Sequence, residues 1–360
     1  MQKFRDCVNG KFFSIDNASE LFTMTVLFGV GNTSACGFPD KIFLLRHIMT
    51  HSELITKLEK NIALAVFGKQ ALVRRCLVAL FAAEHILLED VPGVGKTLIA
   101  QAIAKSIAGD FRRIQFTPDL LPADITGSSI YDTGSKTFHF VRGAIFANIV
   151  LADEINRTTP RTQSAMLEAM NERQVSVDGT TYPLPNPFMV IATENPMEFE
   201  GTYPLPESQL DRFLLRVSVG YPDRQNEINV LKTHQTSRPI DALMPVLTSE
   251  QIVEIQKAVS AIRVDDSINQ YILDIVDATR NHEDLLIGVS TRGAIALSRA
   301  AQAQALLEER SFVVPDDVKS LAVPVLAHRI VTKSILYGNL RQMEESIIER
   351  ILETVPVPVA

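Results

Sequence analysis

Hydrophobic residues follow a helical period in some parts of the chain and form short continuous runs in others. From Ser52 to Gly68 apolar residues recur three and four positions apart, and a second amphipathic helix is predicted over 71–83. Four short apolar runs come next, at 84–89, 148–154, 188–193 and 214–219. Runs of this length without polar alternation are typical of strands buried on both faces of a parallel sheet.

Helical patterns fill the chain between these runs and dominate after the last of them. Helices are predicted at 98–108, 158–173, 264–280, 290–310 and 315–328. Strands that alternate with helices predict an α/β fold, an αβα sandwich around a parallel sheet, followed by an all-helical domain. We expect the α/β core over 51–238 and the helical domain over 239–360, with strand character there only near 311–314.

Residues 1–50 show no sustained period, and we interpret them as a poorly ordered N-terminal extension or a mis-assigned start. The apolar run at 21–30 is about half the length that a membrane span needs, so no span is predicted. An export signal is the alternative, because basic residues precede this run. Asp16 and Glu20 do not fit such a signal.

Charge and cysteine content narrow the class of protein further. The formal net charge is −7, whereas proteins that bind a phosphate backbone usually carry a basic field, so nucleic acid is not expected as the main partner. Three widely spaced cysteines do not predict a disulfide framework or a zinc site. This small number of cysteines, without a predicted disulfide framework, favours a reducing, cytoplasmic compartment.

A glycine-rich segment joins the run at 84–89 to the next helix. It reads Asp90-Val91-Pro92-Gly93-Val94-Gly95-Lys96-Thr97, and Leu98 begins the helical pattern. Glycines let a turn direct its backbone amides at phosphate oxygens, and a helix N-terminus adds a positive dipole end. The lysine and threonine supply a charge for the phosphates and a hydroxyl for Mg²⁺. A Walker A site over 90–98 is therefore predicted, although Asp90 replaces the first glycine of the motif.

Two carboxylates end the run at 148–154, in the pattern of a Walker B strand. Asp153 is predicted to bind Mg²⁺, and Glu154 to act as the general base toward the attacking water. The alternative is an acidic start to the following helix. Together with the glycine-rich segment, this pair predicts ATP hydrolysis.

Two further polar residues stand at the ends of predicted strands. Asn195 follows the run at 188–193 and is a candidate to orient the attacking water, with an Asx turn as the alternative. Arg212 precedes the run at 214–219 and is a candidate to reach the γ-phosphate of a neighbouring subunit. The alternative for Arg212 is a surface salt bridge with Asp211 or Glu207.

Six segments, taken in order, resemble the MoxR family of AAA+ ATPases. They are VPGVGKT at 91–97, FTPDLLPADITG at 116–127, RGAIFANIVLADEINR at 142–157, TQSAMLEAMNERQV at 162–175, VIATENP at 190–196 and LPESQLDRF at 205–213. The resemblance spans about 52–355 and implies an AAA+ P-loop NTPase core with a C-terminal helical lid. It also implies a role for each matching residue: Lys96 and Thr97 in Walker A, Asp153 and Glu154 in Walker B, Asn195 as sensor 1 and Arg212 as an arginine finger in trans.

The resemblance extends to residues outside these segments. Gly288 to Arg292 resembles the sensor 2 segment, so Arg292 is expected to contact phosphates and report the lid angle, although Thr291 replaces a proline. Val66-Phe67-Gly68 resembles the segment that packs on adenine. His328 and Arg329, by contrast, are expected to be ordinary surface or boundary residues.

Two insertions in the core resemble the helix-2 insert and the pre-sensor-1 hairpin. They cover 126–141 and 174–185, and Asp178-Gly179 in the second is a strong hairpin turn signal. In such rings both hairpins can face the pore or a partner. An exposed edge without a role is the alternative.

The function that follows is ATP hydrolysis with Mg²⁺ in a ring of identical subunits, most simply a hexamer. The resemblance implies chaperone-like remodelling of a protein substrate, with a von Willebrand factor A domain protein as a candidate partner. The main alternative is a DNA-remodelling or helicase-loading motor on the same scaffold. A scaffold that binds ATP without turnover, and a small-molecule kinase in which Arg212 acts in cis, are further alternatives.

Overall fold

The computed structural model describes residues 4–8, 11–15, 39–89, 93–195, 201–234, 238–333 and 340–358. The chain divides into two compact units, 1–46 and 47–360. In the first unit β1 (Phe4–Val8) pairs with β2 (Lys11–Ile15) in an antiparallel hairpin. Helix α2 (Pro39–Ala63) begins in the first unit and continues into the second. The interpretation of 1–50 as an extension or mis-assigned start stays a prediction.

A five-stranded parallel sheet lies at the centre of the second unit, as the sequence predicts. Its strand order is β11-β3-β10-β7-β4. The strands are β3 (Ile86–Glu89), β4 (Phe111–Gln115), β7 (Ile149–Asp153), β10 (Met189–Glu194) and β11 (Leu215–Ser218). The sequence pattern missed β4, because this edge strand buries only Ile114 and has no continuous apolar run.

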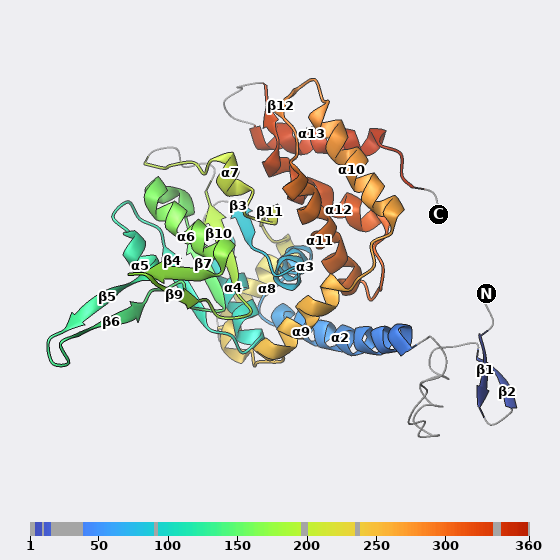
Figure 1. Ribbon diagram of the computed structural model, residues 1–360, viewed down its shortest axis with the longest axis horizontal. Helices are drawn as coiled ribbons and strands as arrows, with labels where there is room; N and C mark the ends of the chain where they lie inside the picture. Colours follow the sequence, from blue (N-terminus) through green and yellow to red (C-terminus); the bar gives the residue numbers. More distant parts are fainter. Residues whose placement is uncertain are drawn as a thin grey trace. The chain divides into compact units, whose positions relative to one another are not determined.

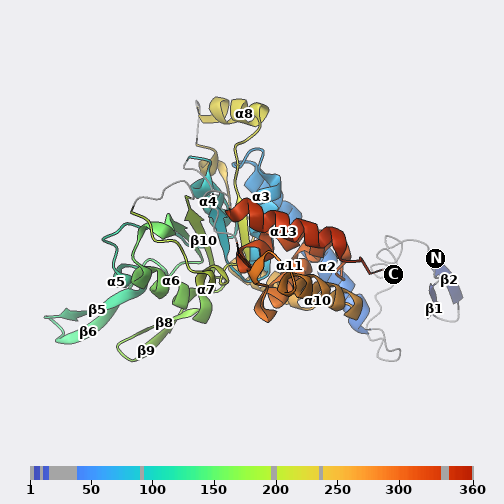
Figure 2. The same cartoon turned by 90° about the horizontal axis from the view of Figure 1, so that it is seen from above.

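Helices cover both faces of this sheet (Figure 1). They are α3 (Gln70–Phe81), α4 (Lys96–Ser106) and α6 (Pro160–Glu172), with short turns at α5 (Pro122–Thr126), η1 (Ile155–Arg157) and α7 (Glu207–Leu210). Helix α8 (Arg224–His234) stands away from the sheet (Figure 2). The core between sheet and helices contains the fully buried Leu87, Val150, Val190 and Phe213. Each such side chain stabilises the fold by about 1.5–3 kcal/mol relative to exposure, so the sheet is a rigid base for the loops at its edges.

Both predicted hairpins are present in the structure. Strand β5 (Gly127–Asp132) pairs with β6 (Thr137–Arg142), and β8 (Gln174–Val177) pairs with β9 (Thr180–Pro183). The turn residues Asp178 and Gly179 both have positive φ, as a type I′ hairpin turn requires. Phe140 of the first hairpin stacks on Tyr182 of the second at 4.0 Å between ring centroids, which joins the two insertions. Figure 2 shows both hairpins extending on the same side of the core.

The C-terminal part of the second unit is helical, as predicted. Its helices are α9 (Ser249–Ser260), α10 (Asp266–Arg280), α11 (Thr291–Leu307), α12 (Pro315–Leu326) and α13 (Leu340–Thr354), with turns η2 (Pro239–Ala242) and η3 (Ala327–Arg329). Two very short strands, β12 (Leu285–Ile287) and β13 (Val331–Thr332), also pair here. They are too short to produce a visible alternation in the sequence. Near 311–314 the structure has only an isolated bridge from Phe312 to Arg263.

Candidate active site

The predicted hydrolytic residues come together at the carboxyl end of the sheet. Lys96 follows β3, Asp153 and Glu154 end or follow β7, and Asn195 follows β10. Strand β10 lies between β3 and β7 and is parallel to both, so the loops that leave these three strands emerge at one edge. Ligands of α/β proteins bind at this edge as a rule.

The described part of the glycine-rich turn has the backbone that an anion site needs. Gly93 and Gly95 have φ of +87° and +95°, and a Cβ built at either position would meet nothing within 4 Å. Gly95 is the N-cap of α4 and makes no side-chain cap bond to the first-turn amides, so these amides are the donors that an anion at this helix N-terminus would bind. Val94 and Lys96 are buried, whereas Thr97 and Leu98 are half-buried. The predicted Asp90, Val91 and Pro92 lie outside the described residues.

Asp153 and Glu154 are held by neighbours that the sequence analysis did not single out. The hydroxyl of Thr193 donates to Asp153 Oδ1 at 2.6 Å and accepts the Glu154 amide at 2.9 Å. Arg113 pairs with Asp153 Oδ2 at 2.5 Å, and Gln115 donates to Glu154 Oε2 at 2.9 Å. Both of these residues come from the edge strand β4, next to β7.

Glu154 also has an unusual backbone. Its φ of 57° lies in the left-handed region, which few non-glycine residues adopt. Such conformations persist where the surrounding structure fixes them, and they cluster at functional sites. The Thr193 hydroxyl and the bond from Arg157 N to the Glu154 carbonyl at 2.9 Å hold this conformation. The strain therefore agrees with a functional role for this carboxylate.

Asn195 is 5% exposed and directly follows Glu194, whose backbone carbonyl lies 3.4 Å from Lys96 Nζ. Burial, together with the nearby carboxylate of Glu89, raises the pKa of Glu194 to about 7, while Arg216 and Lys96 oppose this shift. The predicted sensor 1 residue thus stands between the glycine-rich turn and the Walker B strand, beside a carboxyl that is partly protonated near neutral pH.

A group of buried charges connects this end of the sheet to α13. Glu89, the last residue before the glycine-rich turn, pairs with Arg341 at 2.6 Å, and Arg216 of β11 pairs with Glu344 at 2.5 Å. The Arg216 side chain is only 7% exposed. Charges rarely lie so deep unless paired. Helix α13 of the lid is therefore attached to β3, the strand that leads to Lys96, and to β11.

The segment predicted to pack on adenine lies between α2 and α3. Val66 is buried, and Phe67 and Gly68 are half-buried. Gly68 has φ +68°, and a Cβ there would lie 2.5 Å from the side chain of Asn226 in α8. Lys69 donates to the carbonyl of Val219 at 2.8 Å. The close approach to α8 explains why this position requires glycine.

The two predicted arginines lie at the opposite, amino end of the sheet. Arg212 stands two residues before Leu214, whose amide bonds the carbonyl of His85 just ahead of β3. Its Nη1 donates to the carbonyl of Leu167 at 2.8 Å. Among the described residues no ion pair joins Arg212 to Asp211 or Glu207, so the salt-bridge alternative is not seen; the Asp211 carboxylate contacts Arg329 and Arg292.

Arg292 lies at the same end as Arg212. It donates to Asn171 Oδ1 at 2.8 Å and approaches Asp211 to 3.6 Å, and its side chain is 54% exposed. Asn171 follows Met170, whose carbonyl contacts His85 at 3.2 Å ahead of β3. Figure 2 shows the same separation, with α4 toward the top of the view and α7 toward the bottom. Neither arginine is therefore placed at the glycine-rich turn of its own chain.

Of the two expectations for His328 and Arg329, surface or boundary residues, the surface one is wrong, because both are buried where the lid meets the core. They are 2% and 8% exposed and lie in η3, against the segment that leads into β11. Burial and the adjacent Arg329 lower the pKa of His328 well below its ordinary value, so its imidazole is neutral. A sequence pattern cannot find such residues, because an arginine counts as a polar position whether it is exposed or is buried against a carboxylate.

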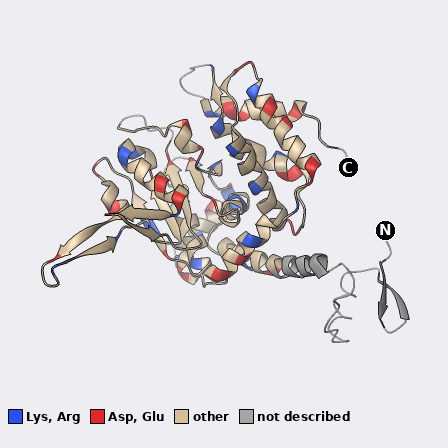
Figure 3. Ribbon diagram, viewed as in Figure 1, with Lys and Arg blue, Asp and Glu red and all other residues tan. Residues whose placement is uncertain are grey.

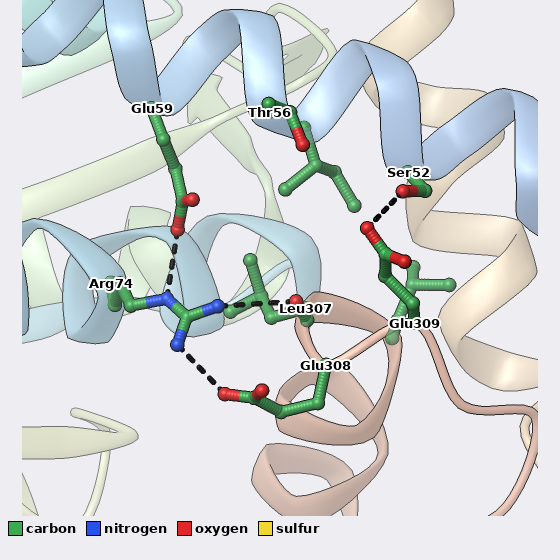
Figure 4. A pocket seen from close by; sticks show the side chains of 9 residues that line it. Ser52, Thr56, Glu59, Arg74, Leu307, Glu308 and Glu309 are labelled. Carbon is green, nitrogen blue, oxygen red and sulfur yellow. Dashed lines mark hydrogen bonds and ion pairs between the residues drawn. The ribbon is translucent and has the colours of Figure 1, made fainter.

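A separate polar pocket of about 340 Å³ lies where α2, α3 and the end of α11 meet. Figure 4 shows Arg74 between Glu59 and Glu308, at 2.9 and 2.7 Å, and Ser52 bonded to Glu309. Its charges are thus paired with one another. The pocket contains none of the predicted site residues, and we interpret it as a connection between the lid and the helices of the core.

The surface carries charges of both signs. Lysine and arginine are interspersed with aspartate and glutamate in helices of both the core and the lid (Figure 3). Among the described residues, no helix has the length and apolar character needed to cross a membrane.

Comparisons with known proteins agree with this architecture. Residues 85–215 match the ATPase family associated with various cellular activities, and residues 277–351 match the AAA lid domain. The uncharacterised protein YeaC of Bacillus subtilis strain 168 is 51% identical over 306 residues, which cover 85% of this chain and 95% of YeaC. Chaperone MoxR1 of Mycobacterium tuberculosis is 40% identical over 304 residues, which cover 81% of this chain and 79% of MoxR1.

A solved structure from Cytophaga hutchinsonii, of a protein proposed to be an ATPase, aligns with a TM-score of 0.82 at 37% identity. The alignment covers 90% of this chain and 100% of that one. The parallel sheet, the glycine-rich turn and the helical lid together define an AAA+ ATPase. Within that class, the chain belongs to the MoxR family.

Proposed function

We propose that this protein hydrolyses Mg²⁺-ATP at interfaces between identical subunits and uses the energy for chaperone-like remodelling of a protein substrate. The observation that carries the proposal is the separation of the site residues. Lys96, Asp153 and Glu154 lie at the carboxyl end of the sheet, and Arg212 and Arg292 at its amino end. One subunit therefore does not bring the full set of charges to its own nucleotide.

The residues at the carboxyl end fit a nucleotide with magnesium. The open space above Gly93 and Gly95 and the uncapped first turn of α4 suit phosphate oxygens. Thr97 and Asp153 supply the hydroxyl and carboxylate oxygens that Mg²⁺ prefers. When bound, the metal neutralises charge on the phosphates during transfer. Lys96 adds a positive charge at the same place.

We assign the hydrolytic step to Glu154 and Asn195. Glu154 accepts a proton from the attacking water, and Asn195 orients that water. In this structure the Glu154 carboxylate bonds Gln115 at 2.9 Å and pairs with Arg157 at 3.2 Å. These contacts hold the carboxylate in place beside the Walker B strand, where it is proposed to act as the base.

Arg212 and Arg292 then serve the site of the next subunit, where they stabilise charge on the γ-phosphate. A ring closes such head-to-tail contacts, and a hexamer is the simplest expectation. The small-molecule kinase alternative requires Arg212 to act in cis, which its place at the amino end of the sheet disfavours.

The proposed biological role rests on the relatives. Chaperone MoxR1 is named as a chaperone, and Protein MoxR of Methylorubrum extorquens is 31% identical over 325 residues. We extend the chaperone role to this chain, with a von Willebrand factor A domain protein as a candidate partner and the cytoplasm as the expected compartment. The two insertion hairpins are the candidate contacts for the protein substrate, and the first of them exposes Tyr131 and Phe138.

Mixing two inactive variants tests the shared site. Lys96→Ala removes the phosphate contact and Arg212→Ala removes the trans charge, so each alone is expected to hydrolyse almost no ATP. A mixture contains interfaces at which an intact Lys96 faces an intact Arg212, and it is expected to recover a fraction of wild-type phosphate release. A mixture as inactive as its components would contradict the shared site. Stimulation by DNA that falls with salt would favour the DNA-remodelling alternative.

A further inference from the structure

Arg329 lies in the lid, yet it binds the segment that presents Arg212. Its Nε donates to Asp211 Oδ1 at 2.7 Å, and its Nη2 donates to the carbonyls of Asp211 at 3.1 Å and Phe213 at 2.7 Å. Its Nη1 reaches the carbonyl of Leu214 at 3.3 Å. One guanidinium therefore contacts the residues on both sides of Arg212 and fixes the direction of that backbone.

Arg329 also packs against the first turn of α11, next to Arg292. A Cβ on Gly293 would lie 3.1 Å from Cδ of Arg329. Gly293 is buried, and its amide is bonded by the N-cap Ser290 at 3.3 Å. Glycine at this position thus lets the Arg329 side chain lie directly under the backbone that carries Arg292.

Asp211 completes the arrangement because both arginines contact its carboxylate. Arg329 bonds Oδ1 at 2.7 Å, and Arg292 approaches Oδ2 to 3.6 Å. The Arg329 side chain is 3% exposed, whereas that of Arg292 is 54% exposed. The buried guanidinium of Arg329 is paired with the carboxylate, whereas the exposed guanidinium of Arg292 can still contact another molecule.

We propose that Arg329 is a positioning residue for the nucleotide site of the neighbouring subunit. It joins the segment 211–214 of the core to the first turn of α11 in the lid, so that Arg212 and Arg292 reach one nucleotide together. The proposal rests on the proposed function, in which these two arginines act in trans. Arg329 itself touches no nucleotide.

The first test compares Arg329→Lys with a matched control, Arg299→Lys. Arg299 is an exposed lid arginine at the same end of the sheet, and it pairs with Glu84 at 2.8 Å. Lysine keeps the charge at position 329 but loses the forked donors. Because a small misplacement of catalytic groups costs up to about 100-fold in rate, kcat is expected to fall about 10- to 100-fold for Arg329→Lys, with KM for ATP within about twofold. The control is expected to keep both constants.

The second test asks in which subunit Arg329 acts. The Arg329→Lys subunit keeps an intact carboxyl end, and the Lys96→Ala subunit keeps correctly placed arginines. Where these two meet in a mixed ring, one nucleotide site is complete, so the ATPase activity of the mixture is expected to exceed the sum of the two variants measured separately. A role in folding alone gives no such recovery, and a mixture equal to the sum overturns the proposal. If Arg329→Lys does not fold, Asp211→Asn removes the shared carboxylate charge with little change of shape and is mixed in the same way.

The two proposals fail in distinguishable ways. If Lys96→Ala and Arg212→Ala fail to complement, the shared site itself is wrong. If that pair complements while neither Arg329→Lys nor Asp211→Asn does, only the positioning role of Arg329 is overturned. Size-exclusion chromatography and thermal melting of every variant show whether the ring and the fold are retained.

Discussion

The two ends of the central sheet are built in different ways. The carboxyl end takes Lys96, Asp153 and Asn195 from loops that directly follow three neighbouring strands. The amino end takes its arginines from the core and from the lid, at positions 212, 292 and 329. Arg292 and Arg329 share the carboxylate of Asp211, and Arg329 also bonds backbone carbonyls on both sides of Arg212. The residues of the first end all belong to the core, whereas the second end includes residues of the lid.

This difference implies that the two ends respond differently to movement of the lid. The carboxyl end contacts the lid through α13, by the pairs Arg341–Glu89 and Arg216–Glu344. At the amino end, residues of the lid are themselves among the proposed functional residues. A shift of the lid therefore changes the strand tips indirectly at one end, but moves Arg292 itself at the other.

Removal of the general base is expected to have the largest effect and to be confined to the carboxyl end. Glu154→Gln is expected to lower kcat about 10³-fold, because the amide cannot accept the proton from water. Nucleotide affinity is expected to remain, since Lys96 and the glycine-rich turn are unchanged. Phosphate release and binding of a labelled nucleotide measure the two effects separately.

Glu168→Gln, on α6, is a suitable control because it makes the same chemical change on an exposed helical surface. Glu154→Gln subunits keep their own arginines and are expected to complement Arg212→Ala subunits. If Glu154→Gln turned over ATP at close to the wild-type rate, Glu154 would not be the general base, and another residue would have to accept the proton.

The hydroxyl of Thr193 provides a sharper test of the same end. Thr193→Val removes the bonds to Asp153 Oδ1 and to the Glu154 amide, at 2.6 and 2.9 Å, with little change in volume. We expect kcat to fall about 10- to 100-fold as these groups lose their alignment. Loss of a buried hydrogen bond is also expected to cost about 1–3 kcal/mol in the free energy of unfolding.

Thr193→Ser is the matched variant because it restores the hydroxyl and lacks only a methyl group. It is expected to recover most of the turnover. Equal activity of the valine and serine variants would show that the hydroxyl does not position the acidic pair. Steady-state kinetics and urea unfolding of the three proteins separate the two effects.

The sequence identifies the carboxyl end well, because its residues lie in short contiguous strings such as the segment at 91–97. It identifies the sheet for the same reason, since central strands are continuous apolar runs. It misses Thr193, which ends such a run, because a single threonine is common in a buried strand and gives no sign of a functional role. It also misses Arg216 and Arg329, because the carboxylates that make their burial acceptable lie on distant elements. Only the packed structure shows these pairs.

Glu194 gives the smallest expected effect, and it concerns the connection between the carboxyl end and the lid. Its pKa in the folded protein is about 7, against 4.5 for the ordinary side chain, because of burial and the neighbouring Glu89. The folded state therefore binds more protons than the unfolded state between these two values. The free energy of unfolding is expected to fall as pH rises from about 4.5 to about 7, and to lose no more from this group above that range.

Glu194→Gln replaces this carboxyl by a group that stays neutral. Relative to wild type, we expect it to stabilise the protein by roughly 3 kcal/mol at pH 8 and by only about 1 kcal/mol at pH 5, where the wild-type carboxyl is mostly protonated in the fold. Urea unfolding at both pH values measures the difference. Asp153 and Glu154 are unchanged, so the comparison isolates the carboxyl beside Glu89 and Arg216. An equal effect at the two pH values would show that Glu194 ionises normally and that burial and the neighbouring Glu89 do not keep it neutral.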